Sequence, residues 1–329
     1  MSLKIVSNLS FTSASTYPVK IFKDTELVRS LNEERTIIPR HVQLCPTNKC
    51  NLSCSFCSCR DRDKNLELSK QDVDDLLEVL NKVKTRGVTI TGGGEPLLFE
   101  HIEYLIERLR HQNIEVGLTT NGVLFDRLNV QIINLCTWIR VSVSDYSTFD
   151  DNFIKGLDYA LHAGSNVDFG FSYIATEKPD IPKIVRTIEY ANSNNFTHVR
   201  LSNDIMSNSR SDLMVIKAEL AKHNIDDGIV IYQSKEDADK GQKSCLISLL
   251  KPMISADGLI YPCCGVQYAK KNEIRDAPYA FNMGNFRDLP DIVEKQAHFN
   301  GSVCESCYYD TYNTYLRLMV ADHKHLSFM

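Results

Sequence analysis

The chain lacks the features of a membrane protein and of a strongly basic one. No apolar run approaches the roughly 18 residues that a membrane-spanning helix requires, and Ser, Thr and Lys interrupt the apolar residues at the N-terminus, where a signal peptide needs an unbroken apolar segment. The formal net charge of the 329 residues is −5, which argues against nucleic acid as a partner. We therefore expect a cytoplasmic protein without a membrane partner.

Disulfides are also not expected. The chain has 11 cysteines, an odd number, and in a reducing compartment thiols serve more often as metal ligands or core residues. The apolar fraction of 43% is ordinary for a globular protein, and the length allows one large α/β domain and a smaller one. The composition thus predicts a globular protein whose thiols are available to bind metal.

From residue 38 onward, short β-rich runs alternate with helical patterns. The runs lie near residues 41–45, 87–91, 114–120, 138–144, 166–174 and 197–203. The first helical pattern begins at a predicted capping box formed by Ser69 and Asp72. Such alternation predicts an α/β fold with a parallel sheet over residues 38–225. Residues 1–37 show no period and are interpreted as an N-terminal extension lying against this domain.

The predicted strands have two different faces. Apolar residues alternate with polar or small ones, whereas parallel strands covered on both faces normally form unbroken apolar runs. The polar face comprises His41, Gln43, Cys45, Thr89, Thr91, Gly117, Thr119, Asn121, Arg140, Ser142, Ser144, Asp168, Gly170, Ser172, His198, Arg200 and Ser202. We therefore expect a curved sheet that encloses a polar cavity. A few irregular strands with misassigned register are the alternative.

Three cysteines follow the first predicted strand directly. Cys50, Cys54 and Cys57 are spaced x3 and then x2, so a tight loop brings their thiols to one point. Three ligands are one fewer than a closed cluster takes, which leaves one metal position open. Further motifs end the second, third and fourth strands. Because the carboxyl ends of barrel strands meet at one mouth, all four motifs are expected there.

The string Cys-x3-Cys-x-aromatic-Cys, followed by Gly93-Gly94-Glu95-Pro96, resembles the signature of the radical S-adenosylmethionine (radical SAM) superfamily. The resemblance implies an incomplete (β/α)6 TIM-like barrel over residues 38–225. It also implies a [4Fe-4S] cluster on Cys50, Cys54 and Cys57, with S-adenosylmethionine on the open iron and a flavodoxin or ferredoxin as the reductant. An enzyme of this kind cleaves S-adenosylmethionine to a 5′-deoxyadenosyl radical, which abstracts hydrogen from an unactivated carbon.

Further contacts to S-adenosylmethionine follow from the same resemblance. The expected residues are Phe56, Gly93, Gly94, Glu95, Asn121, Ser142, Ser144 and Arg200. The glycines would let the backbone approach the methionine moiety, and Glu95 would accept a hydrogen bond from its ammonium group. Cys45 and Cys59 do not fit the motif's spacing and are interpreted as non-ligands. Cys45 is a candidate hydrogen donor to a substrate radical, and Cys136 is interpreted as a core residue.

Cysteines return in the C-terminal part of the chain, after an expected end of the βα alternation near residue 225. The spacing Cys245-x12-Gly258-x4-Cys263 resembles the opening of the auxiliary cluster domains called SPASM and Twitch, with a hairpin turn at Asp257-Gly258. The resemblance implies a second [4Fe-4S] cluster within residues 226–329. Its ligands would be Cys245, Cys263, Cys304 and Cys307, with Cys264 as a substitute for Cys263. A zinc site is the alternative, and a C-terminal helix is expected from Tyr308 to Phe328.

These patterns lead to several functional hypotheses. A closed second cluster favours electron transfer, and therefore an oxidoreductase that dehydrogenates or cross-links a small molecule or peptide. A redox-neutral radical epimerase or isomerase, with a cysteine or tyrosine returning hydrogen, is the first alternative. A non-catalytic zinc-binding module is the second. A nucleic-acid modifying enzyme would need a basic patch such as Arg60, Arg62 and Lys64, although Asp61 and Asp63 count against it.

Overall fold

The structure, a computed structural model, describes residues 19–144, 149–204, 212–223, 225–233, 240–268, 281–305 and 307–324. Within these ranges the strands form one sheet. They are β1 (His41–Leu44), β2 (Gly87–Ile90), β3 (Glu115–Thr120), β4 (Trp138–Ser144), β5 (Asp168–Ala175), β6 (His198–Asn203), β7 (Val230–Gln233), β8 (Met253–Ile254) and β9 (Ile260–Tyr261). The sequence predictions for residues 1–18 and 325–329 lie outside the described part.

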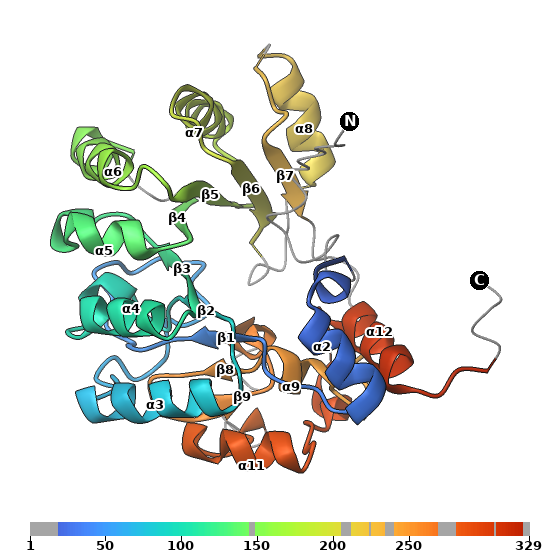
Figure 1. The fold of residues 1–329 in the computed structure, drawn as a ribbon. Coiled ribbons are helices and arrows are strands. Elements are labelled where there is room, and N and C mark those ends of the chain that lie inside the picture. Colours follow the sequence, from blue (N-terminus) through green and yellow to red (C-terminus); the bar gives the residue numbers. More distant parts are fainter. Residues whose placement is uncertain are drawn as a thin grey trace, which may run out of the picture.

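The strand order is β7-β6-β5-β4-β3-β2-β1-β8-β9. Strands β1 to β7 are parallel, β8 pairs with β1 in the same direction, and only β9 runs antiparallel. Figure 1 shows the strands following one another along an arc, with helices on its outer side. The predicted α/β fold with a mostly parallel sheet is therefore confirmed.

Helices connect successive strands and cover the outer face of the arc (Figure 1). They are α3 (Lys70–Lys82), α4 (Ile102–His111), α5 (Val130–Leu135), α6 (Asp151–Ala163), α7 (Ile181–Ser193) and α8 (Leu213–Ala221), with short turns η3 (Pro96–Leu98) and η4 (Phe125–Arg127). The predicted capping box begins α3, because Ser69 accepts from the backbone N–H of Asp72 and Asp72 accepts from that of Ser69. No described helix has both the length and the apolar composition for crossing a bilayer.

The remaining elements lie at the open side of the arc and along its β8–β9 end (Figure 1). They are α2 (Thr25–Arg29), η2 (Ser30–Glu34), α9 (Ile247–Leu250), η5 (Cys264–Tyr268), η7 (Phe286–Asp288), α11 (Leu289–Glu294), η8 (Gly301–Val303) and α12 (Asp310–Val320). Arg35, directly after η2, donates to the carbonyl oxygens of Val320 and Ala321 at the end of α12. The two ends of the described chain therefore pack together.

The two faces of the sheet differ as the alternation predicted. The outward apolar positions are almost fully buried under the helices; they include Val42, Leu44, Val88, Ile90, Val116, Leu118, Ile139, Val141, Val199 and Leu201. Burial of these side chains contributes the main stabilisation, about 25 cal/mol for each Å² of apolar surface removed from water. The inward positions are left for polar side chains, so the core lies between sheet and helices rather than inside the arc.

Three sequence expectations are corrected. The parallel sheet continues past residue 225, because β7 pairs with β6. The sheet also extends at its other edge, where β8 adds to β1 and the predicted turn at Gly258, with a φ of +74°, leads into β9. The C-terminal helix is shorter than predicted, since α12 ends at Val320.

Candidate functional site

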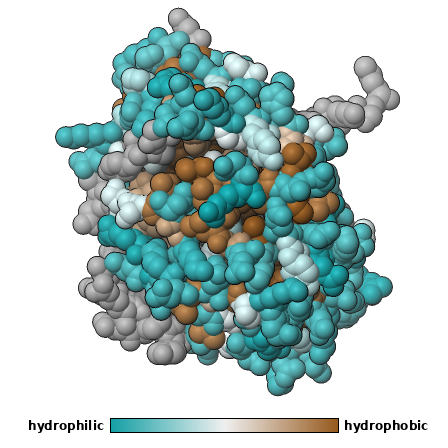
Figure 2. Space-filling model, turned by 90° about the vertical axis from the view of Figure 1, so that its left-hand side faces the viewer, coloured by the Kyte–Doolittle hydropathy of each residue, from teal (hydrophilic) through white to brown (hydrophobic). Residues whose placement is uncertain are grey.

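The inner face of the arc encloses a cavity of about 1280 Å³. Its wall contains most of the predicted polar face, namely His41, Gln43, Thr89, Thr91, Gly117, Thr119, Asn121, Arg140, Ser142, Ser144, Ser172, His198, Arg200 and Ser202. Figure 2 views the opposite, helix-covered side of the arc and shows apolar side chains in the middle of that face, surrounded by hydrophilic ones. The predicted polar cavity is therefore present, and the interpretation of the strands as irregular is wrong.

Three predicted members of the polar face do not line the cavity, each for its own reason. Cys45 is fully buried and does not line the cavity, so its predicted position in the cavity is wrong. Asp168 is exposed at the amino end of β5. Gly170 lies under the ring of His198, which would be 2.3 Å from a Cβ at that position.

The first cysteine set, Cys50, Cys54 and Cys57, lies on one loop at the carboxyl end of β1. All three thiols line the cavity, and the loop turns back on itself because the N–H of Cys57 donates to the carbonyl of Cys54 at 3.1 Å. Burial raises the pKa of Cys54, and the neighbouring Cys50 raises it further. Phe56, between the last two thiols, also lines the cavity. The loop therefore presents three sulfurs to the same space.

The glycines after β2 are required by their contact with this loop. A Cβ on Gly94 would lie 2.0 Å from the carbonyl oxygen of Lys49, and one on Gly93 would lie 1.8 Å from Oδ1 of Asn48. Backbone bonds fix the contact, since the N–H of Glu95 donates to the carbonyl of Lys49 at 2.7 Å. The structure thus gives a different reason for these glycines from the predicted approach to methionine: they let two loops of the mouth touch.

Glu95 is almost completely buried and holds the end of β3. Its carboxylate accepts hydrogen bonds from the hydroxyl of Thr120 at 2.6 Å, from the N–H of Asn121 at 2.7 Å and from the N–H of Leu97 at 3.1 Å. Burial raises the pKa of Glu95, although these hydrogen bonds act in the opposite direction. Its side chain therefore ties two motifs of the mouth together, a role that sequence reasoning missed.

The other expected S-adenosylmethionine contacts also lie on the cavity wall. The side-chain amide of Asn121 donates to Asn51 on the cysteine loop at 2.8 Å, while its Oδ1 accepts from the N–H of Val123. Ser142 and Ser144 end β4 and face the same space. Arg200 lies deeper in the cavity, where it donates to the hydroxyl of Ser172 at 2.8 Å. Asn121, Ser142 and Ser144 therefore lie at the mouth, where the strand ends predicted them, and Arg200 lies below them.

Cysteines near the first set have other environments. Cys59 is buried and hydrogen-bonds to Cys57, and its thiol reaches the carbonyl of Gly92 at 3.9 Å. Cys136 is buried in the core, as expected, with its thiol directed to the carbonyl of Ile132. Arg60 and Lys64 line the cavity but donate to carbonyls of the same loop, so they stabilise the loop.

The second cysteine set, Cys245, Cys263, Cys304 and Cys307, comes from separate segments that converge. Burial raises the pKa of Cys245 to about 12, and the thiols of Cys307 and Cys304 add to this rise. Burial also raises the pKa of Cys263, with contributions from Cys264, Cys245 and Cys304. The N–H of Cys245 donates to the carbonyl of Phe299, which joins two of the segments. A bound metal cation would relieve the repulsion among these thiols in their ionised form.

Cys264, which also interacts electrostatically with Cys263, contacts a tyrosine on the cavity wall. Its sulfur lies 3.0 Å from the hydroxyl of Tyr309, and both side chains line the cavity. Cys263 is the neighbour that interacts electrostatically with Cys245 and Cys304. Of the two adjacent cysteines, Cys263 is therefore oriented toward the second set and Cys264 toward the cavity.

Topology puts the two cysteine sets at opposite ends of the cavity. The first set follows β1, so it lies at the carboxyl ends of the parallel strands. Strand β9 is antiparallel to β8, and Tyr261 pairs with Met253 at the amino end of β8. Cys263 follows directly and therefore lies at the amino ends of the strands. The cavity runs between the two sets, and Cys264 and Cys307 line it at the far end.

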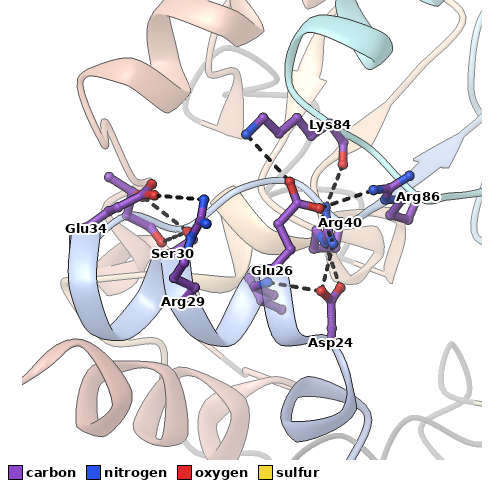
Figure 3. Close-up of polar contacts among 10 residues, drawn as sticks. Asp24, Glu26, Arg29, Ser30, Glu34, Arg40, Lys84 and Arg86 are labelled. Atoms are coloured by element: carbon purple, nitrogen blue, oxygen red, sulfur yellow. Dashed lines mark hydrogen bonds and ion pairs between the residues drawn. The ribbon is translucent and has the colours of Figure 1, made fainter.

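The segment before β1 closes the cavity at its amino end. Arg40 donates to both carboxylate oxygens of Asp24 at 2.7 Å and to Glu26 at 3.0 Å (Figure 3). Glu26 also pairs with Lys84 and Arg86, which directly precede β2. These ion pairs attach α2 to the amino ends of β1 and β2. The predicted N-terminal extension thus supplies part of the cavity floor.

Both cysteine sets have donor chemistry that fits iron–sulfur clusters. Three thiols facing a cavity suit a cluster with one open iron, and four converging thiols suit a closed one. Across the described ranges, no three His, Cys, Asp or Glu side chains converge on a single metal ion. A cube binds thiolates at separate corners instead of at one atom, so this finding concerns single metal ions and not clusters.

Comparison with known proteins identifies the domain. Residues 44–206 match the model of the Radical SAM superfamily. This segment is therefore assigned to a radical SAM domain, and it contains the cysteine loop, the glycine motif and β2 to β6.

The relatives are similar over part of their length. A 7-carboxy-7-deazaguanine synthase of Rhodopirellula baltica is 29% identical over 157 residues, which are 44% of this chain and 60% of that protein. A probable GTP 3',8-cyclase of Methanocaldococcus jannaschii is 32% identical over 92 residues, 27% of this chain and 30% of that protein. The chain thus spans less than two thirds of the length of either relative.

The fold is also similar to a solved structure. SuiB of Streptococcus suis, bound to S-adenosylmethionine, superposes with a TM-score of 0.60 at 17% identity, covering 92% of this chain and 81% of that chain. At this identity the likeness shows the fold alone, an α/β fold with a mostly parallel sheet.

Proposed function

We propose that the protein is a radical SAM enzyme that oxidatively modifies a small molecule or peptide, either by dehydrogenation or by forming a cross-link. The observation that carries this proposal is the direction of the three thiols of Cys50, Cys54 and Cys57 into a cavity whose mouth is formed by polar strand ends. When bound there, a [4Fe-4S] cluster with S-adenosylmethionine supplies an electron and a 5′-deoxyadenosyl radical that removes hydrogen from carbon.

The residues of the mouth would orient S-adenosylmethionine. Ser142 and Ser144 present hydroxyl groups for the ribose or the carboxylate, and Phe56 presents an apolar ring for the adenine. Glu95 and Asn121 join β3 to the loops that carry the cysteines and glycines, so they keep the mouth rigid. A rigid, enclosed site holds reacting atoms in position and excludes water.

The second cysteine set is the basis for proposing an oxidation. Its four thiols leave no metal position open for substrate, so an iron–sulfur cluster on Cys245, Cys263, Cys304 and Cys307 would transfer electrons without binding the substrate. Its location at the floor, on the far side of the cavity from the first set, suits an electron acceptor. A flavodoxin or ferredoxin is the proposed reductant for the first set.

The pair of Cys264 and Tyr309 supports a redox-neutral alternative. A thiol held 3.0 Å from a phenol on the cavity wall can return a hydrogen atom to a carbon radical, which forms a C–H bond and leaves a thiyl radical. An epimerase or isomerase of this kind would take up one solvent deuterium in D₂O at the modified carbon. Net oxidation would take up none.

Iron content and S-adenosylmethionine cleavage test the proposal. We expect about eight irons per chain in anaerobically purified wild type and about four in the variant Cys50→Ala/Cys54→Ala/Cys57→Ala. Reduced wild type should release 5′-deoxyadenosine and the variant should not. Cys136→Ala is the matched control, because it removes a buried thiol away from both sets and should keep both signals.

The outcomes separate the proposals. No iron at the first set, or no 5′-deoxyadenosine from wild type, would refute the radical SAM activity. Zinc at the second set would remove the electron acceptor and with it the preference for oxidation. It would leave cleavage of S-adenosylmethionine intact.

A further inference from the structure

The cavity contains a group of three positively charged side chains, of which only Arg200 is an expected contact of S-adenosylmethionine. Arg140 on β4, Arg200 on β6 and Lys251 before β8 all line the wall. Lys251 directly precedes the pairing of β8 with β1, so it lies at the floor. Arg140 and Arg200 flank β5 on either side, opposite Gly170 and Ser172 respectively. Two strands and one loop thus direct cations into the deeper half of the cavity.

Arg140 is held by two aromatic rings. Its guanidinium lies 5.0 Å from the centre of the Trp138 ring, and its Nε donates to Nε2 of His198 at 3.2 Å. A guanidinium over an indole is attracted by the negative face of the ring. The only tryptophan of the chain therefore supports an arginine that faces the cavity.

Two glycines make room for these rings. A Cβ on Gly117 would lie 2.1 Å from the indole of Trp138, and one on Gly170 would lie 2.3 Å from the ring of His198. Each glycine is the direct strand neighbour of the aromatic residue that covers it. Because Gly117 and Gly170 have no side chain, the rings on β4 and β6 can lie flat against β3 and β5 and reach Arg140.

A chain of hydrogen bonds determines which ring nitrogen of His198 carries the proton. The hydroxyl of Thr197 donates to the carbonyl of Phe169 at 2.9 Å, so its oxygen accepts from Nδ1–H of His198 at 2.9 Å. Nε2 is then the acceptor that Arg140 requires. Burial and the charges of Arg140 and Arg200 lower the pKa of His198 to about 3, which keeps the ring neutral. His198 thus orients Arg140 without neutralising its charge.

The cations influence one another. Burial lowers the pKa of Arg140, and the charge of Arg200 lowers it further. Burial also lowers the pKa of Lys251; the thiols of Cys264 and Cys263 act in the opposite direction, and both arginines lower it again. Desolvated like charges gathered in one cavity favour the binding of an anion. A group of this kind, kept in place by dedicated neighbours, is suited to receive an anion.

The cavity wall also contains five carboxylates, and each lies outside the group of three cations. They are Asp24, Glu95, Glu115, Asp204 and Asp310. Asp24 is paired with Arg40, Glu95 holds the end of β3, and Asp310 contacts Gln242. Glu115 is exposed at the amino end of β3, and Asp204 follows β6 at the mouth. None of these five belongs to the inner layers of β4 to β6.

We propose that Arg140, Arg200 and Lys251 form a binding site for an anionic group of the substrate, a carboxylate or a phosphate, in the deeper half of the cavity. Arginine presents paired donors that match both groups, and lysine adds a third charge. The cavity volume of about 1280 Å³ exceeds the roughly 300–1,000 Å³ of a typical small-molecule site, so S-adenosylmethionine and a substrate fit together. This inference rests on the proposed function, since it takes the cavity as a substrate site.

Calorimetric titration of the anaerobically prepared holoenzyme with inorganic phosphate, and separately with acetate, tests the site in the presence of saturating S-adenosylmethionine. We expect at least one of the two anions to bind. Lys251→Gln and Arg140→Gln should each weaken that binding by about tenfold, because each removes a charged hydrogen-bond donor. Lys251→Arg and Arg140→Lys keep the positive charge and should retain most of the anion binding. The anion that binds more tightly assigns the substrate group as phosphate or carboxylate.

Two exposed cations outside the cavity serve as controls. Lys82→Gln on α3 and Arg127→Gln in η4 remove exposed cations outside the cavity and should leave anion binding unchanged. Circular dichroism of each variant establishes that it is folded. The proposal fails if neither anion binds wild type, if the glutamine variants bind as well as wild type, or if S-adenosylmethionine displaces the anion. Wild-type release of 5′-deoxyadenosine is measured in parallel, so that failure of the radical SAM activity is recognised separately.

Discussion

The two cysteine sets differ in how the chain brings their thiols together. The first lies within one loop, Cys50 to Cys57, and needs only that loop to turn. The second takes its thiols from the segments at Cys245, at Cys263 and at Cys304 to Cys307, which meet only in the folded protein. A site on one loop depends on what holds the loop, whereas a site built from distant segments depends on the whole fold. The two sets should therefore respond differently to mutation.

The largest effect should come from the contact that holds the first set. In Gly94→Ala, the new Cβ would lie 2.0 Å from the backbone oxygen of Lys49, which cannot rotate away. We expect the cysteine loop to be displaced, with loss of about 3 kcal/mol of stability and near-complete loss of 5′-deoxyadenosine formation. Urea unfolding and the cleavage assay measure the two effects.

Gly87→Ala is the matched control for that prediction. Its Cβ would have its nearest neighbour at 4.0 Å, an ordinary contact. We expect a change in unfolding free energy below about 1 kcal/mol and unchanged cleavage. Equal losses in both variants would show that the loop contact has no special role.

The second set should contribute more to stability than a buried thiol does. Cys245→Ala should release metal and cost about 3 kcal/mol, because three segments lose their common ligand. Cys136→Ala, an equally buried cysteine without such neighbours, should cost about 1 to 2 kcal/mol and release none. Thermal unfolding with metal analysis compares them, and similar midpoints for the two would contradict a structural role of the second set.

Glu95→Gln tests whether the mouth is rigid because of one carboxylate. The amide keeps only one acceptor oxygen, so one of the bonds from Thr120, Leu97 and Asn121 is lost. We expect a loss of about 2 kcal/mol together with slower cleavage of S-adenosylmethionine. Glu107→Gln on the exposed side of α4 should change neither. A variant with full stability and slow cleavage would instead indicate direct contact of Glu95 with S-adenosylmethionine.

The smallest effect is expected for the ion pair of Arg40 and Asp24 at the floor of the cavity, and it depends on pH. Burial opposes ionisation of Asp24, but hydrogen bonds from Arg40 and Leu27 and the charge of Arg40 hold its pKa below the usual value. The stabilisation by the pair is thus fully present above the unfolded pKa of about 4 and is lost as pH falls through the lower, folded pKa. Arg40→Gln should cost about 2 kcal/mol at pH 7. The difference from wild type should shrink below about pH 4, and a constant difference would contradict the assignment.

Much of the barrel could be predicted from alternation alone. Burial alternates with a period of two in β1, β2 and β4, whereas β3, β5 and β6 are buried over most of their length; Ser69 and Asp180 mark the starts of helices. Strand β7 was missed because Val230–Gln233 is short and only half-buried. The pairing of β8 with β1 was missed because the two segments are far apart in the chain.

The sequence by itself determined the local features: the cysteine loop, the glycines after β2 and the side of each strand that faces inward. These depend on neighbours in the chain, so spacing and period reveal them. Only the tertiary structure decided that the second cysteine set lies at the floor, that Cys264 and not Cys263 faces the cavity, and that Trp138 and His198 hold Arg140. Those arrangements arise where segments that are far apart in the sequence come into contact, and the spacing of residues along the chain does not predict such contacts.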